Sequence, residues 1–408
     1  MSADAGTGRK ERPLRVAMIG HGFMGAAHSQ AWRTAPAFFA LPRRVEMAVV
    51  TGRNPDGVRE TADRYGWGEA DTDWRRVVER DDIDLVDVVV PGYAHADVAI
   101  AALEAGKHVL CEKPLANTVT EAEAMVRAAT DAAARGVFAM VGFTYRRVPA
   151  VTLARQMVAA GDIGEVRQAR AVYLQDWLRD ENAPLTWRLS KETAGSGALG
   201  DIGAHIVDAV QFVTGQQVTG VSGTTRTFVT ERPVLDQAAG LTGSASTTRR
   251  GPVTVDDAAA FVGTLDGGAL ATFEATRMAS GRKNALRFEI SGSSGALAFD
   301  LEDLNVLRYF RVEDGAAAGF RRILVTEAEH PYAGAWWPPG HLLGYEHAFS
   351  HQVRDLVTAI DAEEQPRPSF PDGLQVQRVL DAVETSSASS ARWTPVGSAV
   401  DPRQGGSS

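Results

Sequence analysis

Three polar residues in two segments of the sequence carry the side chains that oxidation of an alcohol requires. Lys113 follows an apolar run at residues 107–111, and Asp201 and His205 lie four residues apart in a glycine-rich segment. The imidazole of His205 titrates near neutrality and suits a base that removes a hydroxyl proton. The ammonium of Lys113 suits a donor to the developing alkoxide, although a charged residue at a strand end is also often a solvated rim residue.

The spacing of Asp201 and His205 is that of one helix face. If this segment is helical, the two side chains are neighbours, and Ile202 and Ile206 form an adjacent buried stripe. Asp201 then orients the imidazole or contacts a substrate hydroxyl. The alternative is a pair that only caps or stabilises the helix.

A glycine motif near the N-terminus has the spacing of a dinucleotide cradle. Gly20, Gly22 and Gly25 follow an apolar run at residues 15–19 and open a helical pattern. The first glycine permits a tight turn, the second admits a pyrophosphate, and the third lets the helix pack on the strand. The amides of Phe23 and Met24 belong to the same helix N-terminus, which attracts anions. The alternative is a purely structural turn.

The end of the second predicted strand, residues 45–51, bears on the choice of cofactor. An acidic residue there would bind the ribose hydroxyls of NAD, whereas an arginine favours the 2′-phosphate of NADP. Gly52 and Arg53 stand at this place, with no carboxylate. Arg53 either binds a phosphate, stacks on adenine or is simply solvated. The cofactor is therefore NAD or NADP, and we favour NAD.

The elements that must position these residues alternate between short strands and helices. We expect strands at 15–19, 45–51, 85–90, 107–111 and 137–141, and helices at 24–34, after Pro55, and at 95–105 and 120–135. The first helix is expected to stop before Pro36. This βαβ alternation predicts an α/β fold that begins with a doubly wound parallel sheet, a Rossmann domain.

Beyond about residue 149 the strands become longer and glycine-containing links separate them. We expect strands at 166–175, 218–229, 258–275 and 286–299, and helices at 344–360 and 373–386. This pattern predicts an α+β domain with a large open antiparallel sheet. We expect a disordered tail at 1–12, the Rossmann domain at 13–145, a substrate-binding and oligomerisation domain at 146–400, and a second disordered tail at 401–408.

Composition excludes several classes of protein. The 408 residues include 42 Lys and Arg against 51 Asp and Glu, a net charge of −9 that disfavours nucleic acid or an anionic membrane as partner. Cys111 is the only cysteine, so a disulfide framework and a cysteine metal cluster are excluded. No apolar run approaches the roughly 18 residues of a membrane span. A cytoplasmic location is the default expectation.

Several motifs together resemble those of the glucose–fructose oxidoreductase, inositol dehydrogenase and rhizopine catabolism (Gfo/Idh/MocA) family. The resemblance runs over about residues 14–310 and rests on the glycine motif, Pro91, His95, the Glu112-Lys113-Pro114 core, the segment at 142–147, Trp187-Arg188 and the segment at 200–205. It departs from the family at Gly92, where many relatives have Asn, and at Thr144, where many also have Asn. These departures concern placement of the nicotinamide and the substrate.

The resemblance implies a role for each matching position. It implies that Lys113, Asp201 and His205 are catalytic, that the Lys113–Pro114 bond is cis, and that the active site lies between the two domains. The cofactor-binding positions it implies are Pro91, His95, Glu112, Lys113 and Thr144. The substrate-binding positions it implies are Lys113, Tyr145, Arg146, Trp187, Arg188, Asp201 and His205.

A loop rich in proline, glycine and aromatic residues spans residues 330–341. Aromatic planes pack against the C–H faces of sugar rings, and basic side chains donate to ring hydroxyls. Trp336 and His341 are therefore further substrate-binding candidates, in a loop that would cover the cleft. The alternative is packing between domains or between subunits. The amino-acid sequences of this loop and of residues 22–29 resemble those of the levoglucosan and inositol dehydrogenases of the family.

These observations predict an NAD(P)-dependent dehydrogenase that oxidises a secondary hydroxyl of a cyclic polyol or sugar, such as an inositol, levoglucosan or another pyranose. Hydride chemistry belongs to the cofactor, so no metal is expected. One alternative is an NAD-dependent glycoside hydrolase that works through a transient 3-keto sugar. Another is a cofactor-binding regulator without catalysis. The family resemblance also implies a homodimer or homotetramer assembled through the exposed sheet face.

Overall fold

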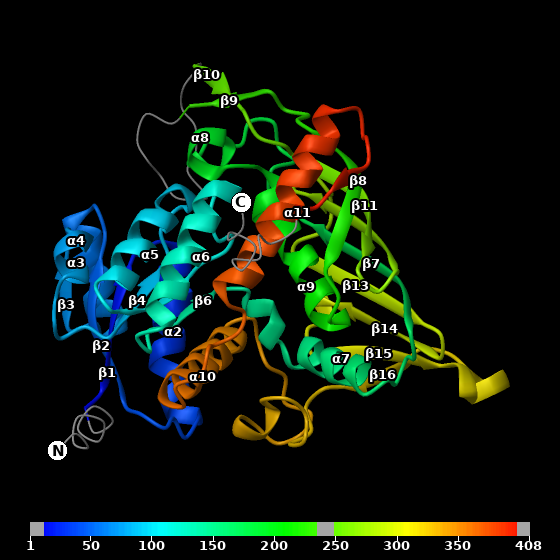
Figure 1. Cartoon of the computed structure of the whole chain (residues 1–408), viewed down its shortest axis with the longest axis horizontal. Helices are drawn as coiled ribbons and strands as arrows, with labels where there is room; N and C mark the ends of the chain where they lie inside the picture. Colours follow the sequence, from blue (N-terminus) through cyan, green and yellow to red (C-terminus); the bar gives the residue numbers. More distant parts are fainter. Residues whose placement is uncertain (1–11, 235–248, 398–408) are drawn as a thin grey trace, which may run out of the picture.

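Two β-sheets lie side by side, and helices fill the space between and around them (Figure 1). This computed structural model describes residues 12–234 and 249–397. The predicted disordered tails at 1–12 and 401–408 lie outside the described residues, apart from Arg12.

The first sheet, sheet A, has the expected doubly wound order. Its strands run in the order β3-β2-β1-β4-β5-β6, and every neighbouring pair is parallel. The central strands are buried and apolar, as in sheets covered on both faces. The strands are β1 (Leu14–Ile19), β2 (Val45–Thr51), β3 (Glu69–Asp71), β4 (Leu85–Val88), β5 (His108–Cys111) and β6 (Ala139–Val141).

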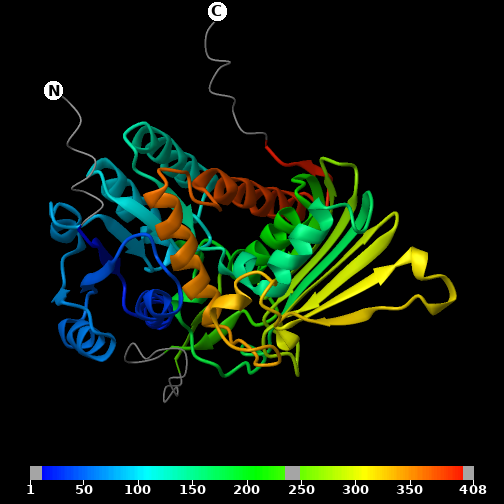
Figure 2. The same cartoon turned by 90° about the horizontal axis from the view of Figure 1, so that it is seen from below.

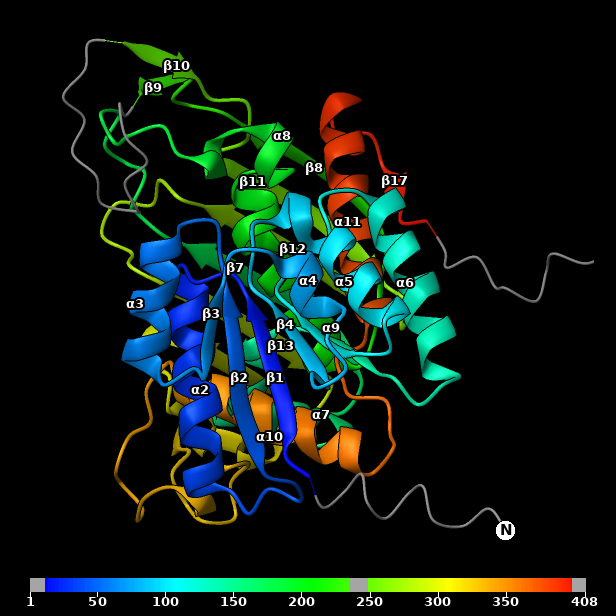
Figure 3. The same ribbon diagram turned by 90° about the vertical axis from the view of Figure 1, so that its left-hand side faces the viewer.

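Helices cover both faces of sheet A (Figure 3). One face packs against α2 (Phe23–Phe38), α3 (Pro55–Tyr65) and α10 (His347–Asp361). The other face packs against α4 (Trp74–Val78), α5 (His95–Glu104) and α6 (Val119–Ala133), and α11 (Phe370–Ala388) lies against α6. Because α10 and α11 come from the end of the chain, the C-terminal segment completes both layers.

The first helix is longer than its sequence predicts. Proline was expected to stop it, but α2 runs to Phe38 with Pro36 inside. Pro36 has no amide to bond to the carbonyl of Trp32, but the helix ends only two residues later, and the amide of Phe39 still bonds to the carbonyl of Ala35 at 2.9 Å. The ring of Phe38 packs 4.3 Å from that of Trp336 and holds this turn in place.

The second sheet, sheet B, is mixed rather than wholly antiparallel. Its strands run in the order β16-β15-β14-β13-β7-β12-β11-β8-β17, and β7 pairs with β12 in parallel. The expected antiparallel meander is therefore wrong at this one pair, because β12 arrives beside β7 only after a long excursion. The strands are β7 (Val166–Leu174), β8 (Val218–Arg226), β11 (Ala258–Leu265), β12 (Leu270–Thr276), β13 (Ala285–Gly292), β14 (Gly295–Asp300), β15 (Val306–Arg311), β16 (Arg321–Leu324) and β17 (Thr394–Pro395), and β9 (Glu231–Pro233) pairs with β10 (Arg250–Pro252) apart from the sheet.

One face of sheet B packs on α7 (Pro149–Ala159), α9 (Ala204–Thr214) and α11 (Figure 2). Along β11 the side chains alternate, with Phe261 buried toward these helices and Val262 exposed on the opposite face. Helix α7 was not foreseen from the sequence. It follows directly on the segment Gly142–Arg147 that joins the two sheets, and the predicted domain boundary near residue 145 stays a prediction. No helix formed by the described residues is long and apolar enough to cross a bilayer.

The turn between β1 and α2 passes very close to the end of β4. Gly20 has a φ of +112°, and a Cβ at this position would lie 2.7 Å from the carbonyl oxygen of Val89. Only glycine tolerates both the left-handed conformation and this approach. Two residues later, Gly22 is exposed, and a Cβ there would meet no atom within 4 Å.

This contrast gives a matched pair of variants. We expect Gly20→Ala to lower the free energy of unfolding by about 1–3 kcal/mol, because it adds strain and a steric clash. Gly22→Ala should leave the free energy of unfolding unchanged. Denaturant unfolding of the protein without added cofactor measures both. Equal stability of the two variants would show that the turn can relax away from Val89.

Candidate active site

Lys113 lies just beyond the carboxyl end of β5 and reaches across to the segment that leads into α9. Its Nζ donates to the backbone carbonyl of Asp201 at 2.8 Å and lies 3.3 Å from Asp201 Oδ1. The peptide bond between Lys113 and Pro114 is cis, which confirms the expectation from the sequence. The side chain of Lys113 is largely buried, so its charge acts in a region of low dielectric constant.

Asp201 and His205 lie where a short π-helical turn, Leu199–Gly203, passes into α9. Asp256 fixes this entry from a neighbouring loop. Its carboxylate accepts from the amide of Gly197 at 2.7 Å and from that of Leu199 at 2.8 Å. The pair is thus helical, as predicted, but in a π register across Asp201 rather than a regular α register.

Three cations surround the carboxylate of Asp201. Burial alone would raise the pKa of Asp201, but Lys113, Arg277 and Arg188 outweigh it and lower the pKa to about 2. Asp201 is therefore ionised throughout the neutral range. Its position between Lys113 and Arg277 Nη1, which lies 3.9 Å from Oδ2, makes it the anionic centre of the site.

His205 has ring contacts but no hydrogen-bond partner within residues 12–234 and 249–397. Its ring centroid lies 4.6 Å from that of Tyr145 and 5.9 Å from that of Tyr173. Burial lowers the pKa of His205 well below its usual value, and the charge of Lys113 lowers it further. The imidazole is therefore neutral near pH 7, with both nitrogens available to a ligand.

A chain of hydrogen bonds runs from Tyr145 across the ends of two central strands of sheet B, β7 and β13. The hydroxyls of Tyr145 and Tyr173 lie 2.8 Å apart, and Tyr173 donates to Asn284 Oδ1 at 2.7 Å. Because the Tyr173 proton is used in this way, Tyr145 is the donor in the first bond. Gln175 also donates to Asn284, at 2.8 Å, and accepts from Trp177 Nε1. Of these residues, the sequence had singled out only Tyr145.

Arg277 is the functional candidate that the sequence analysis missed. It directly follows β12 and is fully buried, and among the described residues its Nε and Nη1 have no hydrogen-bond partner. A Cβ at Gly197 would lie 2.6 Å from its Nη2, so this glycine leaves the room that the guanidinium needs. An arginine that directly follows an apolar strand was the available signal. Arg188, which was predicted, stacks on the exposed ring of Trp187 at 4.4 Å and acts on Asp201 through its charge.

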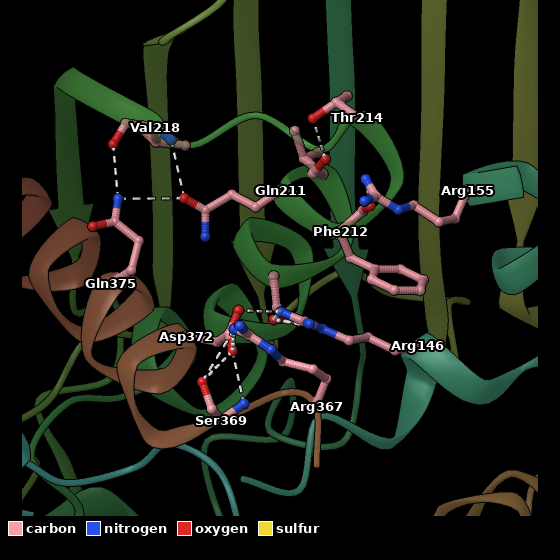
Figure 4. A network of polar contacts seen from close by, with 12 residues as sticks. Arg146, Arg155, Gln211, Phe212, Thr214, Val218, Arg367, Ser369, Asp372 and Gln375 are labelled. Atoms are coloured by element: carbon pink, nitrogen blue, oxygen red, sulfur yellow. Dashed lines mark hydrogen bonds and ion pairs between the residues drawn. The ribbon is translucent and has the colours of Figure 1, made fainter. Parts of the chain in front are cut away.

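Arg146, by contrast, does not join this group. Its Nη2 lies 2.6 Å from Asp208 Oδ1 and 3.9 Å from Asp372 Oδ1, and its guanidinium lies over Phe212. Figure 4 shows Arg146 beside Phe212 and Asp372 in a separate polar network that also contains Gln211. The expectation that Arg146 binds substrate finds no support in these contacts, because its charge is balanced elsewhere.

The loop at residues 330–341 packs on the Rossmann domain instead of covering the three candidate catalytic residues. Trp336 contacts Phe38, Phe39 and His347, and its Nε1 donates to His351 Nε2 at 2.7 Å. His341 is exposed, and among the described residues it bonds only to the carbonyl of Pro338 in its own loop. These contacts favour the alternative of domain packing for this loop.

The glycine turn has the features that a dinucleotide requires. Gly22 is the N-cap residue of α2, and no side chain in the described part of the protein caps this N-terminus, so the first amides remain free for an anion. Phe23 and Gly22 are exposed and Met24 is half-buried, while Gly25 is buried against the backbone of Gly20. This exposed, uncapped helix N-terminus is the arrangement that a pyrophosphate requires.

The region expected to bind the adenosine ribose contains no acidic side chain at the end of β2. Arg53 is exposed, and Asn54 caps α3 by accepting from the amides of Asp56 and Gly57. The ring of His21 occupies the space that a side chain at Gly52 would need. Arg53 is thus free to reach a ligand, as the sequence suggested.

Two further predicted cofactor residues lie at the ends of β4 and β5. His95 is buried and bridges the carbonyls of Val90 and Pro114, each 2.9 Å from a ring nitrogen. It therefore ties the segment of Pro91 to that of Lys113. The side chain of Asn117 fills the space that a side chain at Gly92 would enter.

Thr144 and Glu112 are also buried, and both are held by other side chains. The hydroxyl of Thr144 donates to Gln352 Oε1 at 2.9 Å, which links this segment to α10. Glu112 Oε1 lies 3.0 Å from His28 Nε2, and Glu112 Oε2 accepts from the amide of Lys113. Among the described residues there is no cluster of three or more His, Cys, Asp or Glu side chains arranged to hold a metal.

Two protein-family models match this chain. Residues 14–143 match an oxidoreductase family with an NAD-binding Rossmann fold, and residues 151–298 match the GFO/IDH/MocA C-terminal domain. Residues 14–143 therefore form an NAD-binding domain.

The similar proteins include a levoglucosan dehydrogenase from Pseudarthrobacter phenanthrenivorans. It is 40% identical over 390 residues, which cover 94% of this chain and 98% of the relative. A crystal structure of an oxidoreductase domain protein from Kribbella flavida is 61% identical, with a TM-score of 0.90 over 95% of this chain and all of that one. A levoglucosan dehydrogenase in complex with NADH and levoglucosan is 38% identical, with a TM-score of 0.88 over the same shares.

The contacts of the 330–341 loop can be tested with two adjacent tryptophans. We expect Trp336→Ala to lower the free energy of unfolding by about 2–4 kcal/mol, because it removes a large packed ring and a buried hydrogen bond. Trp337→Ala should cost less, since that side chain is 48% exposed. Denaturant unfolding measures both. A Trp336→Ala variant with unchanged stability would contradict a packing role.

Proposed function

The chain belongs to the Gfo/Idh/MocA family of oxidoreductases, and on this basis we propose that it oxidises a ring carbinol of levoglucosan or a closely related cyclic sugar. Bound NAD supplies the hydride acceptor for this reaction. The observation that carries the proposal is the meeting of Lys113, from the end of sheet A, with Asp201, from the helix that covers sheet B. His205 lies one helical turn further along the same segment.

In this proposal His205 removes the hydroxyl proton. Its pKa is low, so the ring is neutral at physiological pH and ready to accept a proton. Its nitrogens have no competing partner in the described part of the chain. Lys113 donates a hydrogen bond to the same substrate oxygen and stabilises the negative charge that develops there.

Asp201 positions Lys113 and offers an acceptor to a second hydroxyl. It stays ionised because three cations surround it, so it accepts hydrogen bonds and does not donate them. Arg188 and Arg277 are donors only. A ring with several hydroxyls, each of which donates and accepts, matches this mixed lining.

The support for levoglucosan comes from the similar proteins. The dehydrogenase that is 40% identical carries this substrate in its name, and its likeness extends over 94% of the chain. A scyllo-inositol 2-dehydrogenase from Bacillus subtilis is 28% identical over 86% of the chain. We propose NAD rather than NADP as the cofactor, because the neighbouring structures were determined with NADH.

The roles of Lys113 and His205 are tested by removing each side chain. We expect Lys113→Met and His205→Asn each to lower kcat by about 10²- to 10⁴-fold, the usual contribution of a positioned proton-transfer group. Steady-state rates of NADH formation at 340 nm measure the effect. Lys191→Met, which removes an exposed partner of Glu384, is the control and should keep the wild-type rate. Near-normal turnover by either His205→Asn or Lys113→Met would refute its assignment.

The substrate is tested with a panel of levoglucosan, scyllo-inositol, myo-inositol, glucose and glucose 6-phosphate, each with NAD and with NADP. We expect kcat/KM for levoglucosan with NAD to exceed that for every inositol by about tenfold or more, a discrimination that pocket shape can provide. A preference for an inositol would contradict the substrate proposal but keep the reaction class. Release of an aglycone from a glycoside without net NADH formation would contradict both.

A further inference from the structure

A buried cluster of three ionisable side chains lies behind the end of β5, apart from the three candidate catalytic residues. Asp87 comes from β4, His28 from α2 and Glu112 from the residue that precedes Lys113. His28 Nδ1 lies 2.9 Å from both carboxylate oxygens of Asp87, and His28 Nε2 lies 3.0 Å from Glu112 Oε1. The three residues are at most 4% exposed.

The contacts fix the protonation of His28. A neutral imidazole donates from only one nitrogen, whereas both nitrogens of His28 face carboxylates, so the doubly protonated ring satisfies both. Burial alone would lower the pKa of His28, but the charges and hydrogen bonds of Asp87 and Glu112 outweigh it and raise the pKa to about 10. Asp87 also accepts a hydrogen bond from Trp32 Nε1 at 2.7 Å.

The cluster therefore holds two negative charges and one positive charge, a net charge of −1. In residues 12–234 and 249–397, His28 is the only cationic group that forms an ion pair with either carboxylate. Lys113 is next to Glu112 in sequence, but its ammonium is turned to Asp201. The remaining negative charge is thus left without a side-chain counterion in contact with it.

This charge lies at the edge of sheet A where a dinucleotide binds. In open α/β sheets ligands occupy the carboxyl ends of the strands, and Glu112 stands at the carboxyl end of β5. The cations Lys113, Arg188 and Arg277 lie on the other side, around Asp201. The uncompensated negative charge therefore lies behind the end of β5, separate from the group of charges around Asp201.

We propose that the Asp87–His28–Glu112 cluster makes this site bind the oxidised, cationic nicotinamide ring in preference to the neutral reduced ring. A buried charge acts over several ångströms because little water screens it. The oxidised ring carries the positive charge that the cluster lacks, and the reduced ring does not. The inference rests on binding of the dinucleotide and not on the identity of the sugar.

The test compares dissociation constants for NAD and NADH without any sugar. NADH binding is followed by its fluorescence, and NAD binding by displacement of NADH, at one fixed pH for all variants. Glu112→Gln and Asp87→Asn each remove one negative charge and keep the side-chain shape. We expect each to weaken NAD binding relative to NADH by about fivefold or more, the effect of one unit charge at an effective dielectric constant of about 20.

Trp32→Phe is the matched control, because it removes a hydrogen bond from the same cluster without a change of charge. Its ratio of the two dissociation constants should equal that of the wild type. The proposal is overturned if Glu112→Gln and Asp87→Asn keep the wild-type ratio, or if Trp32→Phe shifts the ratio equally. Where circular dichroism shows that one of the two charge variants does not fold, the ratio measured with the other variant tests the proposal. A shifted ratio in a protein that oxidises no sugar would contradict only the proposed function.

Discussion

The contact between Lys113 and Asp201 is the constraint on which the rest of the site depends. It joins the end of β5 in sheet A to the turn that leads into α9 on sheet B. The site therefore exists only if the two sheets and their helices pack together correctly. The ammonium bonds to both the backbone and the carboxylate of Asp201, and this fixes the direction of the side chain as well as its position. His95 holds the Lys113 segment from behind, and Asp256 holds the entry of α9 from the other side.

Local patterns in the sequence predicted the parts of this arrangement that depend on short stretches of chain. The alternating strands and helices, the glycine turn and the helical spacing of Asp201 and His205 are all set within a few residues. Contacts between segments that are distant in the sequence could not be predicted from these local patterns. Tyr145 and Arg146 are adjacent in one short turn, yet the first contacts His205 and the second pairs with Asp208. Only the packed structure separates two such neighbours.

The same limit explains the C-terminal segment. The composition of the loop at 330–341 suits a sugar site, but it suits the covering of exposed aromatic rings equally well, and composition cannot decide between them. In the structure Phe38 extends beyond the proline that was expected to end its helix, and Trp336 covers it. The extension of α2 past Pro36 and the packing of the 330–341 loop on the Rossmann domain therefore have the same cause, the contact between Phe38 and Trp336. Arg277 was missed because its position after an apolar strand does not show that it is buried, and its acidic neighbour, Asp201, is known only from the structure.

The low pKa of His205 carries a cost that Lys113 offsets. A weakly basic imidazole is a poor acceptor for the proton of an ordinary hydroxyl, because proton transfer depends on the difference between the two pKa values. The charge of Lys113 lowers the pKa of His205, but it also lowers the pKa of any hydroxyl that it contacts, by the same electrostatic argument. The difference between the pKa of His205 and the pKa of the substrate hydroxyl is thereby largely preserved. In the proposed reaction, the low proton affinity of the imidazole would also let it return the proton readily to water.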